Sequence, residues 1–263
     1  MENLEKIKKK KFLIIGSGHK LSLEKSYIRA FKNLKIKNID YLFLDTGKLE
    51  SFFNKHSFFD GFLSKVAEKK INLKLTKSKF DYIIVFKGMQ LSYSFLKNLK
   101  KIQNKTKFIN IYTDNPFNLS SKTNSNLNVI RTIKLYDYFC ISFNRTLNKR
   151  LKKFGAKKIV FLPFGKDIAK NKITKLVNEK KIINKINFVG SFDKHREKFL
   201  NDLNFNIDVF GPGWKKKHNL NGKLNIYPRT IDGMKLKRII SKYAISLNIL
   251  RKQDRNSHNM KTF

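Results

Sequence analysis

The sequence predicts an α/β protein made of two Rossmann-like domains with parallel sheets, and three observations support this fold class. Short apolar runs of strand length alternate with segments of helical periodicity along most of the chain. The runs are almost continuously apolar, as in Phe80–Gly88 (FDYIIVFKG), which is typical of strands buried on both faces of a parallel sheet. The same pattern restarts at Ile186 after a lysine-rich break, so a second sheet is expected to follow the first.

The first half alternates strands and helices in the order of a doubly wound domain. Its predicted strands are the run that ends at Gly16, then Ile39–Leu44, Phe80–Gly88, Lys107–Thr113, Tyr136–Ser142 and Lys158–Leu162. Its predicted helical segments are Ser22–Leu34, Leu49–Ile71, Tyr93–Ile102 and Asn144–Phe154, the first of them capped by Ser22. Pro163 and Gly165 then break the pattern, so we predict an N-terminal domain over residues 1–165.

The second half repeats this organisation over residues 166–263. Its predicted strands are Ile186–Phe192, Ile207–Phe210, Lys223–Ile226 and Ile245–Leu250, with helices at Lys194–Leu203 and Asp232–Ser241. The chain ends soon after a strand that belongs in the centre of such a sheet, and no helix follows to cover it. We therefore expect the second domain to be truncated.

Charge is the strongest signal for a different function. Lys and Arg total 58 against 19 Asp and Glu, a formal net charge of +39, and such an excess attracts nucleic acid or anionic lipid. The lysines are spread evenly and accompany many Asn, Ile and Phe, as codon bias in an AT-rich genome would produce, although Glu stays scarce. A basic nucleic-acid-binding protein without catalytic activity is therefore the alternative hypothesis.

Cysteine content and hydropathy predict the compartment. The single cysteine, Cys140, lies in an apolar run and cannot form an internal disulfide, which favours a reducing compartment. No signal-peptide core and no run of membrane-spanning length is present, so a cytoplasmic protein is expected.

Two turns at predicted strand ends carry candidate catalytic residues. Gly16-Ser17-Gly18-His19 follows the first strand, where the glycines allow the backbone to approach a substrate closely. His19 could act as a base or bind the acceptor substrate. Asp114 follows the fourth strand in YTDNPF, where Asn115-Pro116 would turn its carboxylate outward. Each turn also has a purely structural interpretation, as a tight turn without chemistry.

Other cofactor classes are disfavoured by the same residues. A dinucleotide fingerprint needs a third glycine where this chain has Leu21, although Asp45 lies near the place of the usual ribose-binding acid. No P-loop and no metal-ligand spacing is present, so neither a cofactor nor a metal is expected.

Four segments give the chain a family resemblance. YTDNPF at 112–117, INFVGSFDKHRE at 186–197, VFGPGW at 209–214 and ISLNILRKQDRNSHNMKTF at 245–263 resemble the CgeB-like, spore-maturation-type glycosyltransferases, nearly from end to end of the chain. The resemblance implies the metal-independent GT-B fold, with the acceptor on the first domain and the nucleotide-sugar donor on the second. Members of this family continue with a Glu-containing segment that would begin just after Phe263, so the resemblance implies a fragment without the catalytic carboxylates.

The resemblance also implies the donor-site residues. It places donor contacts at the turn after the first strand of the second domain, at the next glycine turn, and after the last strand. These candidates are Gly190, Ser191, Arg196, Gly211, Gly213, Trp214, Asn248, Arg251 and His258. Arg196 and Arg251 would hold the diphosphate, His258 a sugar hydroxyl, and Trp214 would either stack on the base or sugar or serve as a core anchor.

The expected function is transfer of a sugar from a nucleotide-diphosphate donor to an acceptor hydroxyl. It would proceed by orientation of both substrates and electrostatic stabilisation of the leaving diphosphate, in a cleft between the two domains. A cell-surface glycan or glycolipid acceptor would suit the basic surface, which predicts peripheral contact with anionic membrane.

Overall fold

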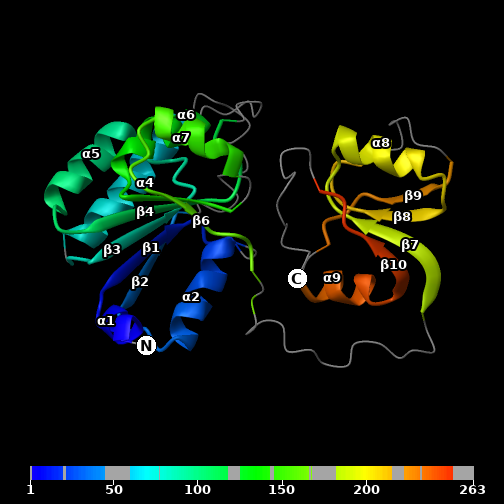
Figure 1. Cartoon of the computed structure of the whole chain (residues 1–263), viewed down its shortest axis with the longest axis horizontal. Helices are drawn as coiled ribbons and strands as arrows, with labels where there is room; N and C mark the ends of the chain where they lie inside the picture. The colour runs from blue at the N-terminus through cyan, green and yellow to red at the C-terminus, as the bar shows by residue number, and fades with distance from the viewer. Residues whose placement is uncertain are drawn as a thin grey trace. The chain divides into compact units, whose positions relative to one another are not determined.

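The computed structural model describes residues 2–19, 22–44, 60–76, 78–117, 125–142, 145–165, 167, 182–214, 222–231 and 233–250. The chain divides into two compact units, Met1–Asp167 and Ile168–Phe263 (Figure 1). The predicted helical segment Leu49–Ile71 lies partly outside the described residues, and its described part is helix α4 (Asp60–Leu75).

Unit 1 contains a six-stranded parallel sheet in the order β2-β1-β3-β4-β5-β6. The strands are β1 (Phe12–Gly16), β2 (Ile39–Phe43), β3 (Tyr82–Phe86), β4 (Lys107–Tyr112), β5 (Tyr138–Ile141) and β6 (Ile159–Phe161). The predicted α/β class with parallel strands is confirmed. Strand order reverses between β1 and β3, so the loops after these two strands run in opposite directions. The crevice between such loops is where doubly wound sheets bind ligands.

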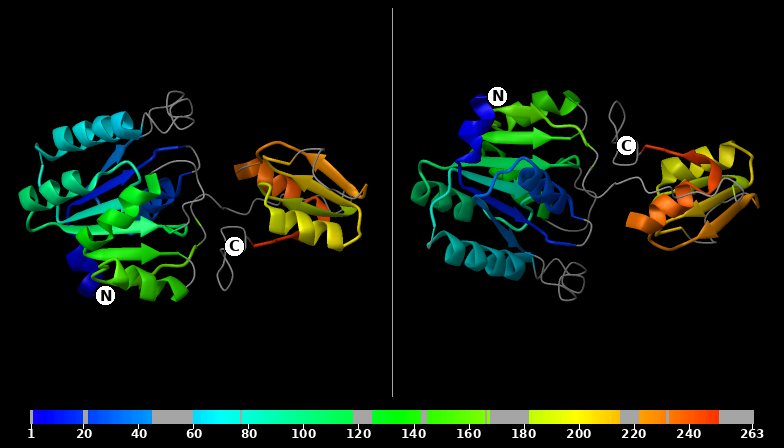
Figure 2. Two further views of the ribbon diagram at one scale, coloured as in Figure 1. Left: turned by 90° about the horizontal axis from the view of Figure 1, so that it is seen from above. Right: turned by 90° about the horizontal axis from the view of Figure 1, so that it is seen from below.

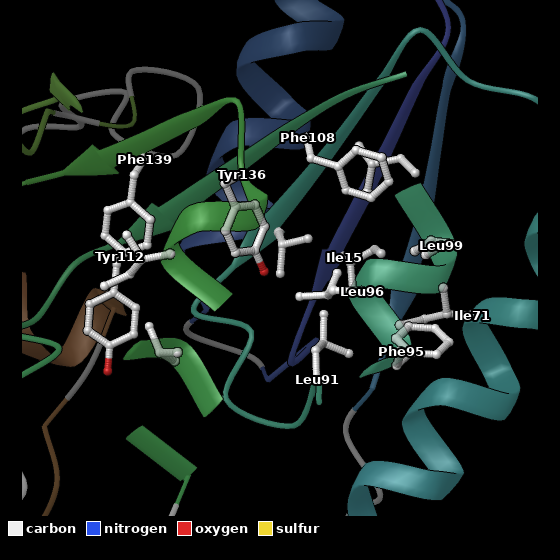
Figure 3. Packing of buried hydrophobic residues seen from close by; sticks show 14 of the residues in the cluster. Ile15, Ile71, Leu91, Phe95, Leu96, Leu99, Phe108, Tyr112, Tyr136 and Phe139 are labelled. Carbon is white, nitrogen blue, oxygen red and sulfur yellow. The ribbon is translucent and has the colours of Figure 1, made fainter. Parts of the chain in front are cut away.

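Helices cover both faces of this sheet, as two views show (Figure 2). The helices of unit 1 are α1 (Glu2–Lys8), α2 (Leu23–Asn33), α4, α5 (Tyr93–Ile102), α6 (Ser125–Thr132) and α7 (Asn148–Lys153). One core cluster joins Ile28 of α2 to Phe12, Ile14 and Ile84 of the strands. A larger cluster on the other face brings Ile71 of α4 and Leu96 and Leu99 of α5 against strand residues such as Ile15 and Phe108 (Figure 3).

Unit 2 contains a four-stranded parallel sheet in the order β10-β7-β8-β9. Its strands are β7 (Ile183–Val189), β8 (Ile207–Phe210), β9 (Leu224–Tyr227) and β10 (Tyr243–Leu247). Helix α8 (Lys194–Asp202) packs on one face through Leu200, and α9 (Gly233–Ile240) lies on the other (Figure 1). The order reverses between β7 and β10, so this sheet has its own switch point where their loops part.

A row of polar residues crosses the sheet of unit 2. Ser246, Asn187, Asp208 and Asn225 are direct register partners from β10 to β9. Ser246 Oγ lies 2.7 Å from Asn187 Oδ1, and Asn225 Nδ2 donates to Asp208 Oδ1 over 2.8 Å. Tyr243 Oη donates to Asp208 Oδ2 over 2.7 Å, so side-chain bonds link β10 to β7, β8 to β9 and β10 to β8 in addition to the backbone ladder.

Two helices were absent from the prediction. Helix α1 is short and basic, and its Ile7 is 39% exposed, so it has no apolar face for periodicity to detect. Helix α6 continues into a 3₁₀ turn (Ile133–Leu135), and the deeply buried residues described along this stretch are Val129, Thr132 and Ile133. Such short, weakly amphipathic helices depend on packing against the sheet rather than on their own sequence pattern.

Candidate functional site

The glycine turn of unit 1 is filled by one of the protein's own carboxylates. Glu24, in the first turn of α2, is buried at 3% exposure. Its Oε1 accepts the Gly18 N–H over 2.7 Å and the Ser17 hydroxyl over 3.1 Å. A Cβ at Gly16 would lie 2.5 Å from Glu24 Cδ, so glycine at position 16 makes room for this carboxylate. The space inside the turn after β1 is therefore occupied by one of the protein's own carboxyl groups.

His19 is exposed at the end of this turn. Its backbone N–H donates to Ser17 Oγ over 3.3 Å, and its carbonyl accepts from the Ser22 N–H over 2.9 Å. Ser22 occupies the N-cap position of α2, but its hydroxyl makes no capping hydrogen bond, so the predicted cap by this side chain is wrong. The catalytic role of His19 stays a prediction.

Asp114 follows β4 and pairs with a lysine from the neighbouring strand. Lys87 Nζ lies 2.8 Å from Asp114 Oδ2, and the two side chains are 49% and 45% exposed. The Phe117 N–H donates to Asn115 Oδ1 over 3.0 Å, so the predicted turn forms through an Asx hydrogen bond. Asp114 is thus held outward at the carboxyl end of the sheet, while its catalytic role stays a prediction. Lys87 was missed, because a lone lysine after a strand carries no sequence signal.

Two glycine turns of unit 2 touch each other. A Cβ at Gly211 would lie 1.9 Å from the Gly190 carbonyl oxygen, so only glycine allows this approach. The Gly190 N–H donates to the Phe210 carbonyl over 2.7 Å, and the Gly211 N–H donates to the Tyr227 carbonyl over 3.1 Å. The ends of β7, β8 and β9 are thereby fixed relative to one another.

Trp214 supports these turns from inside the core. It is 1% exposed, its Nε1–H donates to the Gly190 carbonyl over 2.8 Å, and its ring meets Phe188 and Phe192 edge-on. The structure thus places Trp214 as a core anchor, the second of the two interpretations, because a buried indole presents no face for a base or sugar to stack on.

Arg196 bridges the two sides of the switch point in unit 2. It is 6% exposed, and its Nε and Nη2 donate to the Ile249 carbonyl after β10 over 3.1 and 3.0 Å. Its Nη1 donates to the Ser191 carbonyl after β7 over 3.1 Å. The guanidinium therefore lies directly beside the predicted donor turn, where it holds two loops together; contact with a diphosphate stays a prediction.

The remaining predicted donor residues are more scattered. Gly213 has a φ of +85° and faces Phe192, and Asn248 is exposed after β10. Arg251 and His258 lie outside the described residues.

The two switch points differ in charge. The turn after β1 holds the carboxylate of Glu24, whereas the turn after β7 holds the guanidinium of Arg196. Asp193 already caps α8 through the His195 N–H at 3.0 Å, so in unit 2 the positive charge near the turn comes from Arg196 rather than from an open helix end. Arg196 thus adds a positive charge beside the second turn, whereas the first turn contains the carboxyl group of Glu24.

No protein-family model matches the chain, and no curated protein matches it. Among solved structures, the chain is similar to TcCGT1 in complex with UDP, with 11% sequence identity and a TM-score of 0.42 over 93% of this chain and 69% of that one. A likeness of this size supports no conclusion about activity, and the resemblance to the CgeB-like family stays a prediction.

Neither a metal centre nor a membrane span is found in the described part of the chain. Among its residues, no group of three or more His, Cys, Asp and Glu side chains could hold a metal ion. None of its helices has both the length and the apolar content needed to cross a membrane.

Proposed function

We propose that the chain is the acceptor- and donor-binding part of a GT-B-type glycosyltransferase, with the nucleotide-sugar bound by unit 2 and the acceptor by unit 1. The observation that carries this proposal is the opposite charge at the two glycine turns. A nucleotide diphosphate has two or more negative charges, so the Arg196 side of unit 2 favours it and the Glu24 side of unit 1 disfavours it.

In the proposed reaction, the acceptor hydroxyl attacks the anomeric carbon of the donor sugar. A new carbon–oxygen bond forms while the bond to the diphosphate oxygen breaks, and the nucleoside diphosphate leaves with the electron pair. His19 takes the hydroxyl proton, and Asp114 orients the acceptor. Arg196 supports the diphosphate site by fixing the loops after β7 and β10, and its charge stabilises the leaving group.

Several finer features belong to the same proposal. We propose that transfer requires no metal ion, that the family is CgeB-like, and that the acceptor is a cell-surface glycan or glycolipid precursor. Peripheral contact with anionic membrane would be supplied by the lysine-rich surface, since each exposed cation near such a surface adds attraction.

A thermal-shift screen of UDP, GDP, ADP and their sugar conjugates tests the donor assignment. At a ligand concentration 100 times the Kd, binding to the folded state adds about 2.7 kcal/mol, which raises Tm by several degrees in a protein of this size. Inorganic pyrophosphate is the control for general anion binding. A nucleotide that gives no larger shift than pyrophosphate, or steeply salt-dependent binding of DNA or RNA in place of any nucleotide, would contradict the proposal and favour the nucleic-acid alternative.

The location of the binding site needs a second measurement. Trp214 is the only tryptophan and donates to the Gly190 carbonyl, so a nucleotide at this turn should change its fluorescence. Binding that shifts Tm but leaves the Trp214 emission unaltered would place the nucleotide elsewhere.

A further inference from the structure

Lys87 is the central residue of a tight turn after β3, closed by the Gly88 N–H that donates to the Phe86 carbonyl over 2.8 Å. Among the described residues, three that are not glycine have positive φ: Lys35 at 59°, Lys87 at 60° and Asn204 at 53°. Lys35 and Asn204 directly follow the last turns of α2 and α8, where a left-handed residue is a common helix ending. Lys87 instead follows strand β3, and a left-handed residue with a Cβ is costly there.

Buried polar groups hold Lys87 in this conformation. The Lys87 N–H donates to the Ile111 carbonyl over 3.0 Å, and Asn110 Nδ2 donates to the Lys87 carbonyl over 3.2 Å. Asn110 is fully buried at 0% exposure in the adjacent strand β4. Gly88 follows with a φ of +73°, and a Cβ there would lie 2.9 Å from Val85 Cγ1. The surrounding structure therefore maintains the strained turn, a pattern that concentrates at functional sites.

The turn places an ammonium group against a carboxylate near the switch point of unit 1. Lys87 Nζ and Asp114 Oδ2 are 2.8 Å apart, and about half of each side chain is exposed to solvent. The ammonium and the carboxylate neutralise each other, so the pair has no net charge to attract a charged ligand, while a neutral polar ligand can contact both groups. A hydroxyl group can donate to the carboxylate and accept from the ammonium, and two neighbouring hydroxyls can contact both at once.

We propose that the Lys87–Asp114 pair binds neighbouring hydroxyl groups of a neutral sugar, and that the strained conformation of Lys87 is retained for this purpose. In naming the chemistry of the acceptor, this inference rests on the proposed function. It adds Lys87 to the acceptor site and gives the positive φ at residue 87 a role.

The test combines NMR titration with substitutions at Lys87. The full chain, with assigned backbone amides, is titrated with methyl pyranosides of the gluco, galacto and manno configurations. At least one should shift the amide signals around residues 87 and 114. Lys87→Met, which keeps the Cβ but removes the ammonium, should weaken that binding at least tenfold, and Lys87→Arg should restore part of it. Pyranosides that leave these signals unmoved, or that bind Lys87→Met as tightly as the natural chain, would overturn the proposal.

Two separate substitutions by glycine test whether the strained backbone of Lys87 is retained for binding. Lys87→Gly should raise the melting temperature of unit 1 by a few degrees and abolish pyranoside binding, because glycine adopts positive φ without penalty. Lys35→Gly, the matched control, should also stabilise but leave binding unchanged. Retained binding in Lys87→Gly would refute the role of the side chain.

Failure of this inference can be told apart from failure of the proposed function. The pyranoside titration needs no donor, and the nucleotide screen needs no acceptor. Nucleotide binding without pyranoside shifts would refute the Lys87 assignment alone, whereas pyranoside binding without any nucleotide would keep it and refute the donor site.

Discussion

Substitution of Gly211 by alanine should destabilise unit 2 strongly. The new Cβ would lie 1.9 Å from the Gly190 carbonyl oxygen, far inside van der Waals contact, and the φ of +155° is one that side chains rarely adopt. The ends of β7 and β8 must separate, which weakens the bond from the Gly190 N–H to the Phe210 carbonyl and the bond from Trp214 Nε1–H to the Gly190 carbonyl. Loss of two such bonds at about 1 kcal/mol each, with added backbone strain, gives about 2–4 kcal/mol.

Urea denaturation followed by Trp214 fluorescence measures this loss, because the only tryptophan lies in the core of unit 2. With a slope of about 1–1.5 kcal/mol per molar urea for a unit of this size, the midpoint should fall by roughly 2 M. Gly222→Ala is the matched control, since a Cβ at that position meets nothing within 4 Å. If both variants unfold at the same urea concentration, the close approach of the two turns does not exist in solution.

Three further predictions concern unit 1. Glu24→Ala should cost about 2–4 kcal/mol by circular dichroism in urea, because it empties a buried space and leaves the Gly18 N–H unpaired, while Glu24→Gln should cost less; equal losses would contradict this account. Burial raises the pKa of Cys140 from 9.0 to about 11, so the folded state binds the proton more tightly than the unfolded state, and stability should fall as pH rises from 9 to 11. Cys140→Ala should flatten that decline, and an unaltered slope would disprove the assignment. Burial alone would raise the pKa of Asp137, but hydrogen bonds from the Phe108 N–H and Lys100 outweigh it and hold that pKa below its usual value. Asp137→Asn should therefore cost about 1–3 kcal/mol at neutral pH and almost nothing in strong acid, which urea denaturation followed by circular dichroism can verify.

Much of the fold could be predicted because its strands are continuous apolar runs. Phe80–Gly88 contains β3, and Lys107–Thr113 contains β4, with bounds that differ by one or two residues. Parallel pairing followed from the alternation with helices. Helix α1 was not predicted, because its mostly polar sequence shows no apolar periodicity.

The candidate site was less predictable because its contacts are long-range. Nothing in the spacing of Gly16 and Glu24 indicates that one leaves space for the other. Arg196 carries the charge expected of a phosphate ligand, yet which carbonyls it contacts depends on the end of β10, more than fifty residues later. The positive φ of Lys87 depends on Asn110 in a neighbouring strand. A lysine with positive φ cannot be recognised from the sequence, whereas a glycine at position 87 would have indicated a turn.

The polar row across the sheet of unit 2 bears on how that sheet assembles. Apolar parallel strands can slide past one another with little loss of burial, but sliding β8 by one residue would turn Asp208 toward Leu200 and the helix α8 side. A buried carboxyl group without hydrogen-bond partners is costly in such surroundings. We expect misaligned intermediates to be rejected during folding for this reason, and an Asp208→Leu chain to populate several strand alignments that hydrogen exchange would reveal as lost protection in β9 and β10.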